Sequence, residues 1–258
     1  MGDSDDNVIG RVDRLDTGLF DAIPSQTSQK DRRSLLAVQR ATARRYGRYS
    51  YLEIGSHLGG SIQPHLLDPR CQAIYSIDAR PAAQPDDRSP GCVVAYDGNS
   101  TERMLGLLRG LSPDGVGKVR CFDSDASAVD PARIDPRPHL AFIDGEHTRR
   151  AVLSDFAFCR AVLAPGGTIV FDDFPIVYPA VLEICQSLRQ TGERVTTARL
   201  EGKAFAVFFD EEVVLADPFL GRCRARSRFT LLRYRGKLLA RSMLPGEAGG
   251  RARAARRG

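Results

Sequence analysis

The chain has 258 residues, of which 42% are hydrophobic, and this suits one compact α/β enzyme domain with extensions. No apolar run approaches the roughly 20 residues of a membrane-spanning helix, and the acidic, polar N-terminal residues are unlike a secretory signal peptide. Six scattered cysteines without a C-x-x-C pair predict reduced thiols in a cytoplasmic protein. The net charge of +5 is uneven: residues 221–258 contain twelve Lys or Arg and one acid, a net of +11, so the rest carries −6.

The first half of the chain alternates predicted helices and strands. In chain order they are a helix over 29–46 capped by Ser28, strands over 49–54 and 73–77, an irregular Pro-rich loop over 79–91, a short strand over 93–96, and a helix that runs from the capping-box sequence NSTE at 99–102 to residue 111.

The second half continues this alternation. In chain order it contains strands over 118–122 and 139–143, a helix over 151–163, a strand over 167–171, a helix over 177–190 and strands over 193–200 and 204–209. The last two strands flank a tight turn at Glu201, Gly202 and Lys203, so we expect them to be antiparallel. Parallel βα units that end in an antiparallel hairpin predict an α/β sandwich with one reversed strand.

The strand-to-turn sequence YLEIGSHLGGS at 51–61 is the most informative stretch. Asp78 ends the next strand 23 residues after Gly55, close to the roughly 20-residue spacing of a ribose-binding acid. The glycines Gly55, Gly59 and Gly60 do not form the dinucleotide pattern G-x-G-x-x-G, and the carboxylate of Glu53 would repel a pyrophosphate. It suits a ligand with an ammonium and a sulfonium group, as in S-adenosylmethionine. The alternative is an ordinary strand-to-helix turn with Asp78 as a helix cap.

A second group of acids follows two later strands. Asp144 and Glu146 come after the strand over 139–143, and Asp172 and Asp173 come after the strand over 167–171. Because parallel strands end at one edge of a sheet, we expect these carboxylates to converge and to need a cation between them. Oxygen ligands favour a hard divalent ion such as Mg²⁺. The alternative is that Asp144 and Asp172 are local caps. For the neighbouring His147, general-base and structural roles both stay open.

These motifs, read in the order EIGSHLGGS, SIDAR, FIDGEH, LAPGG and FDDF, resemble the class I S-adenosylmethionine-dependent methyltransferases. The nearer resemblance, over 49–209, is to the metal-dependent macrocin and catechol O-methyltransferases and the cephalosporin-hydroxylase group. It implies a Rossmann-like, three-layer fold with a seven-stranded sheet whose last strand is antiparallel. It also implies O-methylation of a small hydroxylated metabolite or sugar, assisted by a divalent metal. The competing hypothesis is a non-catalytic or NAD-linked protein on the same scaffold.

The resemblance also implies a role for each site residue. The cofactor-binding residues are Glu53, Gly55 and Ser56 at the methionine end, Gly59 where the backbone approaches, Asp78 at the ribose, and Asp125 and Ala126 at the adenine. The metal ligands are Asp144, Asp172 and Asp173, and the candidate catalytic bases are Glu146 and His147. The chain departs from the catechol type in having a D-D pair for D-N, and in the loop over 80–91, which replaces a regular helix.

We divide the chain into an extension and helix over 1–48, a methyltransferase domain over 49–212, a basic amphipathic segment over 213–244 and a disordered basic tail over 245–258. In the third part, a helix over 228–244 is predicted from leucines spaced seven apart and a basic stripe: Leu231, Leu232, Leu238, Leu239, Arg233, Lys237 and Arg241. This helix either docks on the body or contacts an anionic membrane or partner, so the localisation is cytoplasmic with peripheral membrane contact as one alternative. No base-reading motif predicts specific nucleic-acid binding, and the oligomeric state stays open.

Overall fold

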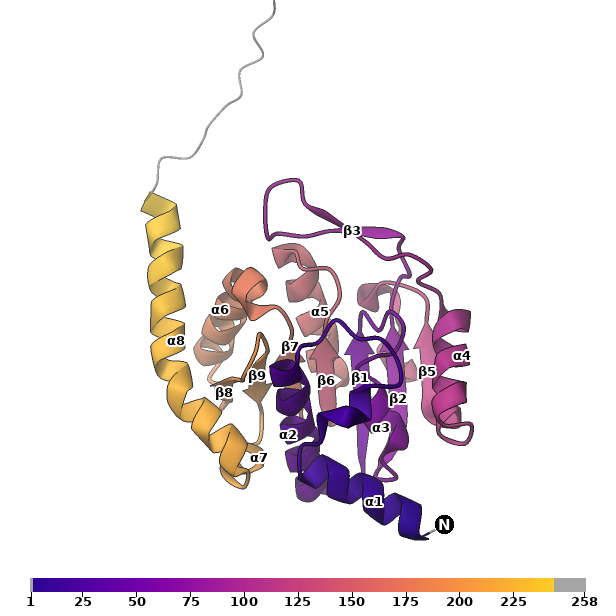
Figure 1. Cartoon of the computed structure of the whole chain (residues 1–258). Helices are drawn as coiled ribbons and strands as arrows, with labels where there is room; N and C mark the ends of the chain where they lie inside the picture. Colours follow the sequence, from indigo (N-terminus) through magenta and orange to yellow (C-terminus); the bar gives the residue numbers. More distant parts are fainter. Residues whose placement is uncertain (1, 244–258) are drawn as a thin grey trace, which may run out of the picture.

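The computed structural model describes residues 2–243 and contains a central seven-stranded sheet (Figure 1). The predicted disordered tail over 245–258 lies outside the described residues. In sheet order the strands are β5 (Val119–Phe122), β2 (Cys71–Ile77), β1 (Tyr49–Ile54), β6 (Leu140–Ile143), β7 (Thr168–Phe171), β9 (Phe205–Phe208) and β8 (Thr196–Arg199). Only β9 is reversed, and it pairs antiparallel with both β7 and β8. The predicted fold class is confirmed.

Helices cover both faces of the sheet. They are α1 (Gly2–Asp13), α2 (Gln29–Tyr46), α3 (Gln63–Leu67), α4 (Thr101–Leu111), α5 (Arg149–Val162), α6 (Phe174–Gln190), α7 (Glu211–Leu215) and α8 (Pro218–Met243). One hydrophobic core joins the sheet to α2, α3, α4 and α7, and a second joins its other face to α5 and α6. The parallel strands are buried between these layers, which explains why β1 is buried along its whole length.

Local sequence signals fixed several elements correctly. Helix α2 spans the predicted range, and Ser28 and Asp31 form a reciprocal capping box at its N-terminus. The cap of α4 lies one residue later than the NSTE pattern indicates, because the Ser100 hydroxyl, and not Asn99, accepts the hydrogen bond from Arg103 N. The predicted hairpin around Gly202 is present as β8 and β9.

Helices α1, α3 and α7 were not predicted, and two further segments differ from the prediction. The Pro-rich loop contains β3 (Ala83–Pro85), which pairs with β4 (Val93–Ala95) in a small separate hairpin above the carboxyl edge of the sheet (Figure 1). Helix α8 begins at Pro218, ten residues before the predicted helix, and runs along the β8 edge of the sheet. It therefore covers a strand edge that would otherwise expose unpaired backbone groups.

The leucine repeat of α8 does not form one face. Leu231 is 8% exposed and belongs to the core, whereas its neighbour Leu232 is 65% exposed. All six cysteines are free, with Cys92 and Cys121 partly accessible and the others buried. Within residues 2–243, no helix has the length and apolarity that crossing a membrane requires.

Candidate functional site

The loops after β1 and β6 meet at one point of the sheet edge. Because these strands are parallel neighbours, their carboxyl ends lie side by side, and Asp144 N donates to Ile54 O over 2.9 Å. Gly55 has a φ of +88°, and a Cβ at this position would overlap the backbone carbonyl of Asp144. Only glycine fits both constraints, so the Gly-rich turn is needed for the close approach of the two loops.

A cavity of about 500 Å³ lies on one side of Gly55. The residues of its wall that matter here are Gly55, Asp78, Asp125, Ala126, Glu146 and Asp155. The Asp78 carboxylate is 5% exposed and accepts hydrogen bonds from the backbone amides of His57 (2.9 Å) and Arg80 (2.8 Å). These two bonds fix the carboxylate at the end of β2. The structure therefore brings together the residues predicted for the ribose and adenine.

Two residues predicted to contact the cofactor lie behind the turn. Glu53 is fully buried, and its carboxylate accepts hydrogen bonds from Tyr51 Oη and Ser61 Oγ, both at 2.6 Å. Burial outweighs these bonds and raises the pKa of Glu53 to about 8. Gly59 has a φ of +81°, and a Cβ there would lie 3.1 Å from Met104 Cγ. Neither residue lines the cavities on the two sides of Gly55, and both support the turn; their contact with a cofactor stays a prediction.

A second cavity, of about 150 Å³, lies on the other side of Gly55. The residues of its wall used below are Gly55, Ser56, His57, Asp144, Asp173 and Lys203. His147 and Asp172 also line this cavity. Gly55 is common to the two cavities, so a ligand that fills both must pass this residue.

Cationic side chains surround the acids of the second cavity. Lys203 Nζ lies 2.9 Å from Asp173 Oδ1, and Arg88 Nη2 lies 3.9 Å from Asp173 Oδ2. His147 Nε2 is 3.6 Å from Asp144 Oδ1, and its Nδ1 is 3.8 Å from Asp173 Oδ2. The repulsion expected between the carboxylates is thus reduced by groups of the chain itself.

These contacts shift the pKa values of His147 and Asp172. Burial opposes charge on His147, but the hydrogen bond and charge of Asp144, with further help from Asp173 and Asp86, raise its pKa to about 9. The imidazole is therefore protonated at neutral pH. Burial, followed by the charges of Asp144 and Asp173, holds the pKa of Asp172 well above its usual range. Asp172 Oδ1 is buried and has no hydrogen-bond partner among the described residues.

The predicted metal ligands lie at one edge but do not form a metal site. Asp144, Asp172 and Asp173 all line the second cavity. However, among residues 2–243 no group of three or more His, Cys, Asp or Glu side chains has an arrangement that could hold an ion. Lys203, bonded to Asp173, lies beside the acids in place of a metal. The donor set as it lies fits an internal ion-pair cluster better than a metal.

The two predicted catalytic bases face different cavities. Glu146 lines the larger cavity, where it accepts a hydrogen bond from Thr148 Oγ1 at 2.6 Å. His147 lines the smaller one. Although Glu146 and His147 are adjacent in the chain, their side chains therefore line different cavities.

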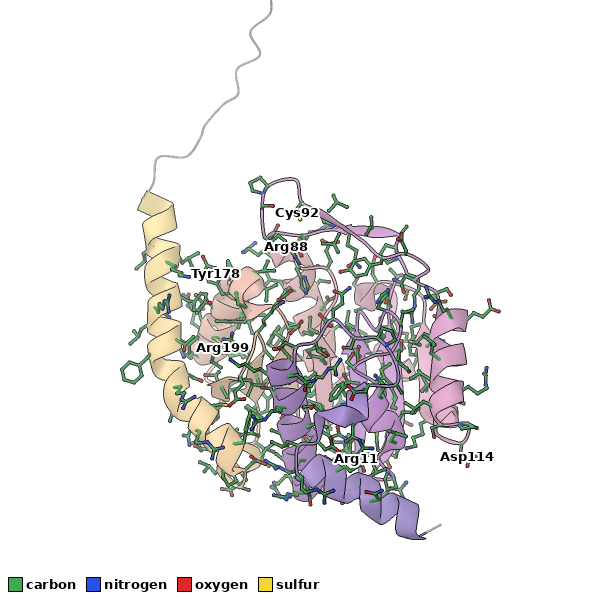
Figure 2. The ribbon with its side chains drawn as sticks, viewed as in Figure 1. Arg11, Arg88, Cys92, Asp114, Tyr178 and Arg199 are labelled. Atoms are coloured by element: carbon green, nitrogen blue, oxygen red, sulfur yellow. The ribbon has the colours of Figure 1, made fainter. Side chains whose placement is uncertain are left out.

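The β3–β4 hairpin contributes residues that sequence analysis missed. Asp86 is 4% exposed, and its Oδ2 lies 3.1 Å from His147 Nδ1. Arg88 forms a two-bond ion pair with Asp86 and reaches toward Asp173, and Figure 2 shows it on the hairpin above the sheet edge. Asp87 N also donates to the carbonyl of His147. A Pro-rich loop with three-residue strands carries no periodicity that could have indicated these contacts.

His57 and Lys203 were missed for a different reason, because each lies in a turn. His57 has a φ of +45°, lines the smaller cavity, and its Nε2 is buried without a hydrogen-bond partner in the described part of the chain. Burial lowers its pKa, assisted by Arg80 and opposed by Asp78, so the ring is neutral at neutral pH. Lys203 follows the Gly202 turn, and its backbone N donates to Asp31 Oδ1 at 2.6 Å.

Comparison with known proteins agrees with this geometry. Residues 52–174 match the model of a family described as a methyltransferase domain. An uncharacterized protein, R132, from Acanthamoeba polyphaga mimivirus is 26% identical over 149 residues, which are 54% of this chain and 61% of that protein. The chain thus matches about three fifths of this relative's length.

Two solved structures share the fold. The O-methyltransferase TomG from Streptomyces achromogenes, involved in tomaymycin synthesis and solved in complex with S-adenosylmethionine, superposes with a TM-score of 0.51 at 15% identity, covering 79% of this chain and 89% of TomG. The O-methyltransferase NovP superposes with a TM-score of 0.55 at 14% identity, covering 78% of this chain and 98% of NovP.

Residues 52–174 match a methyltransferase domain, and the sheet has the Rossmann-like topology of the methyltransferases. The predicted resemblance is confirmed at this level, and the NAD-linked alternative is disfavoured.

Proposed function

We propose that the protein methylates a hydroxyl oxygen of a small molecule, using S-adenosylmethionine bound across Gly55. The observation that carries this proposal is the pair of cavities, about 500 Å³ and about 150 Å³, that share this one glycine. The larger has the volume and the fixed acid that an adenosine group needs. The smaller is lined by titratable side chains and suits a polar acceptor.

The larger cavity fits the adenosine portion of the cofactor. The Asp78 carboxylate is held by two backbone amides and keeps lone pairs for the ribose hydroxyls. Asp125 and Ala126 line the same wall, where we assign the adenine. When bound, the cofactor supplies a methyl group on a positively charged sulfur, and the domain has to align the acceptor oxygen with it.

His57 is the side chain best suited to remove the acceptor proton. It lines the acceptor cavity, its lowered pKa leaves it neutral, and its buried Nε2 has no partner within residues 2–243. His147 is less suited to this role, because three surrounding carboxylates keep it protonated. We assign His147 and Lys203 to the stabilisation of the negative charge that develops on the oxygen.

Magnesium assistance stays an alternative form of the same proposal. It is supported by Asp172 Oδ1, which has no hydrogen-bond partner within residues 2–243, and by the charges of Asp144 and Asp173 that raise the pKa of Asp172. It is disfavoured by the ion pair between Lys203 and Asp173. Turnover measured in excess chelator and again with added Mg²⁺ separates the two forms. Activity that persists in chelator supports the metal-free form, and activity that returns only with Mg²⁺ supports the alternative.

The test of the function is transfer of a labelled methyl group from S-adenosylmethionine to a panel of hydroxylated metabolites. With an accepted substrate, His57→Gln should lower kcat by about 100-fold or more, with little change in affinity for S-adenosylhomocysteine. His139→Gln is the matched control, because His139 is a half-buried histidine whose Nδ1 accepts from Ser50 N away from both cavities. An unchanged kcat in His57→Gln would remove His57 from the reaction. Labelling of nitrogen or carbon but never oxygen would overturn the O-methylation proposal.

A further inference from the structure

Helix α8 presents two different faces. Its inward face, which includes Leu220, Cys223 and Leu231, is buried against the two cores, and Tyr234 packs edge-on against Phe174 at 4.8 Å. The helix is therefore attached to the body through side chains along most of its length. A segment that served only to cover the β8 edge would need no apolar residues on its other side.

The outward face nevertheless carries large apolar side chains. Phe229 is 78% exposed and Leu232 is 65% exposed. They lie three residues apart, which places them next to each other on one side of a helix. They are the two most exposed large hydrophobic residues of the described chain. Val93, on the β3–β4 hairpin, follows at 62% and Leu239 at 60%. Contiguous exposed apolar groups of this kind mark interaction surfaces.

The same helix is strongly basic. Residues 218–243 contain eight Lys or Arg and no Asp or Glu. Arg224 is paired with Glu211, but Arg226 and Arg233 form no ion pair with any described residue. At 100° per residue, both lie within about 60° of Phe229 on the helix circumference. An apolar stripe thus runs beside free positive charges.

A cavity of about 310 Å³ lies between α8 and the turn that joins β8 to β9. Arg226, Thr230 and Arg233 line its α8 side. Arg199 lines the opposite wall, but its guanidinium is already bonded to the carbonyls of Leu200, Gly202 and Ala204. The cavity contains one acid, Glu201. The Thr230 hydroxyl donates to the carbonyl of Arg226, so the α8 side offers two arginines to an anionic group.

We propose that α8 binds the surface of an anionic phospholipid bilayer. Phe229 and Leu232 enter the boundary of the acyl chains, while Arg226 and Arg233 bind headgroup phosphates at the cavity. Charge decides between a bilayer and a second copy of the chain. Two copies joined through this face would bring two basic helices together, whereas an anionic bilayer neutralises them.

Sedimentation of the full-length protein with vesicles tests the proposal. Binding should be seen with vesicles that contain phosphatidylcholine and phosphatidylglycerol, should be weak with phosphatidylcholine alone, and should fall as salt rises. The double variant Phe229→Ser/Leu232→Ser should lose at least about tenfold in vesicle affinity. Leu215→Ser, which alters an exposed leucine on α7, is the control and should bind as the wild type does.

The charge contribution is tested separately. Arg226→Gln/Arg233→Gln should weaken binding by at least about tenfold. Arg48→Gln/Arg109→Gln removes the same charge from exposed sites away from α8 and should have little effect. Affinity for S-adenosylhomocysteine should be unchanged in every variant, which shows that the domain is folded.

Three results would overturn the proposal. The first is a wild-type protein that does not bind anionic vesicles. The second is equal weakening by the α8 variants and their matched controls, which would show that binding does not depend on α8. The third is a wild-type dimer that Phe229→Ser/Leu232→Ser converts to a monomer with vesicle binding intact, which would assign the stripe to a second copy.

Discussion

At the scale of single residues, the site depends on how buried acids are balanced. Asp78 is held by backbone amides, Asp173 by Lys203, and Asp144 by His147. Glu53 is different, because its only hydrogen-bond partners among the described residues are the neutral hydroxyls of Tyr51 and Ser61. A carboxyl group in that environment favours its protonated form.

This difference predicts a pH dependence of stability. The pKa of Glu53 is raised to about 8 in the folded protein, so between its ordinary value of 4.5 and 8 the folded state holds one more proton than the unfolded state. The free energy of unfolding should therefore fall as pH rises through this range, by up to about 1.4 kcal/mol per pH unit. Glu53→Gln should remove this part of the slope in denaturant titrations.

The control is Glu102→Gln, which alters an exposed glutamate on α4 and should leave the slope unchanged. A Glu53→Gln slope equal to that of the wild type would show that Glu53 does not hold the extra proton.

At the scale of elements, the β3–β4 hairpin is bonded to the carboxyl edge of the sheet. Its contacts are the approach of Asp86 to His147 and the bond from Asp87 N to the His147 carbonyl. A further bond runs from Arg149 N, at the start of α5, to the Asp87 carboxylate at 2.9 Å. The hairpin is therefore attached at one end of the acceptor cavity.

Loss of the Asp86 contact should loosen the hairpin. In Asp86→Asn, the ion pairs of Asp86 with Arg88 and His147 are lost, and only neutral hydrogen bonds remain. Amide hydrogen exchange in β3 and β4 should become about 10-fold faster, which corresponds to roughly 1.4 kcal/mol, while exchange in β1 should not change. Asp97→Asn alters an exposed aspartate after β4 and serves as the control. Equal exchange rates in Asp86→Asn and the wild type would show that this contact does not hold the hairpin.

Elements with strong local signals could be predicted, and elements fixed by distant contacts could not. Helix α2 has its cap in the sequence, and the β8–β9 turn has its glycine. By contrast, β3 gains its structure from pairing with β4 and from Asp86 reaching His147, 61 residues away. The leucine spacing in α8 predicted a helix correctly. It also put Leu231 and Leu232 on the same apolar face, whereas in the structure Leu231 is buried and Leu232 is exposed.

The site was predictable to the same extent. Acids at strand ends follow from the parallel topology, so Asp78, Asp144, Asp172 and Asp173 could be assigned to one edge. Lys203 could not, because it comes from the reversed strand's turn and reaches the edge only through the sheet order. Without that lysine, the acids indicated a metal; with it, much of the negative charge is balanced within the chain.

At the scale of the whole molecule, the functional surfaces are separated. The two cavities open at the carboxyl edge of the sheet, under the β3–β4 hairpin, while α8 runs along the β8 side (Figure 1). Asp114 lies at the opposite end of the sheet, far from the hairpin residues Arg88 and Cys92 (Figure 2). We therefore expect separate variants to remove the proposed cofactor binding and the proposed membrane binding independently.

The affinity for S-adenosylhomocysteine, measured by calorimetry in the wild type and in Asp78→Asn, tests the central assignment most directly. We expect the wild type to bind S-adenosylhomocysteine in preference to NAD, and Asp78→Asn to weaken this binding by about 1.5–3 kcal/mol, the scale of a lost charge-assisted hydrogen bond. Asp114→Asn, at the distant end of the sheet, should bind as the wild type does. Equal affinity in the wild type and Asp78→Asn, or preferential binding of NAD, would contradict the assignment of the larger cavity to the cofactor.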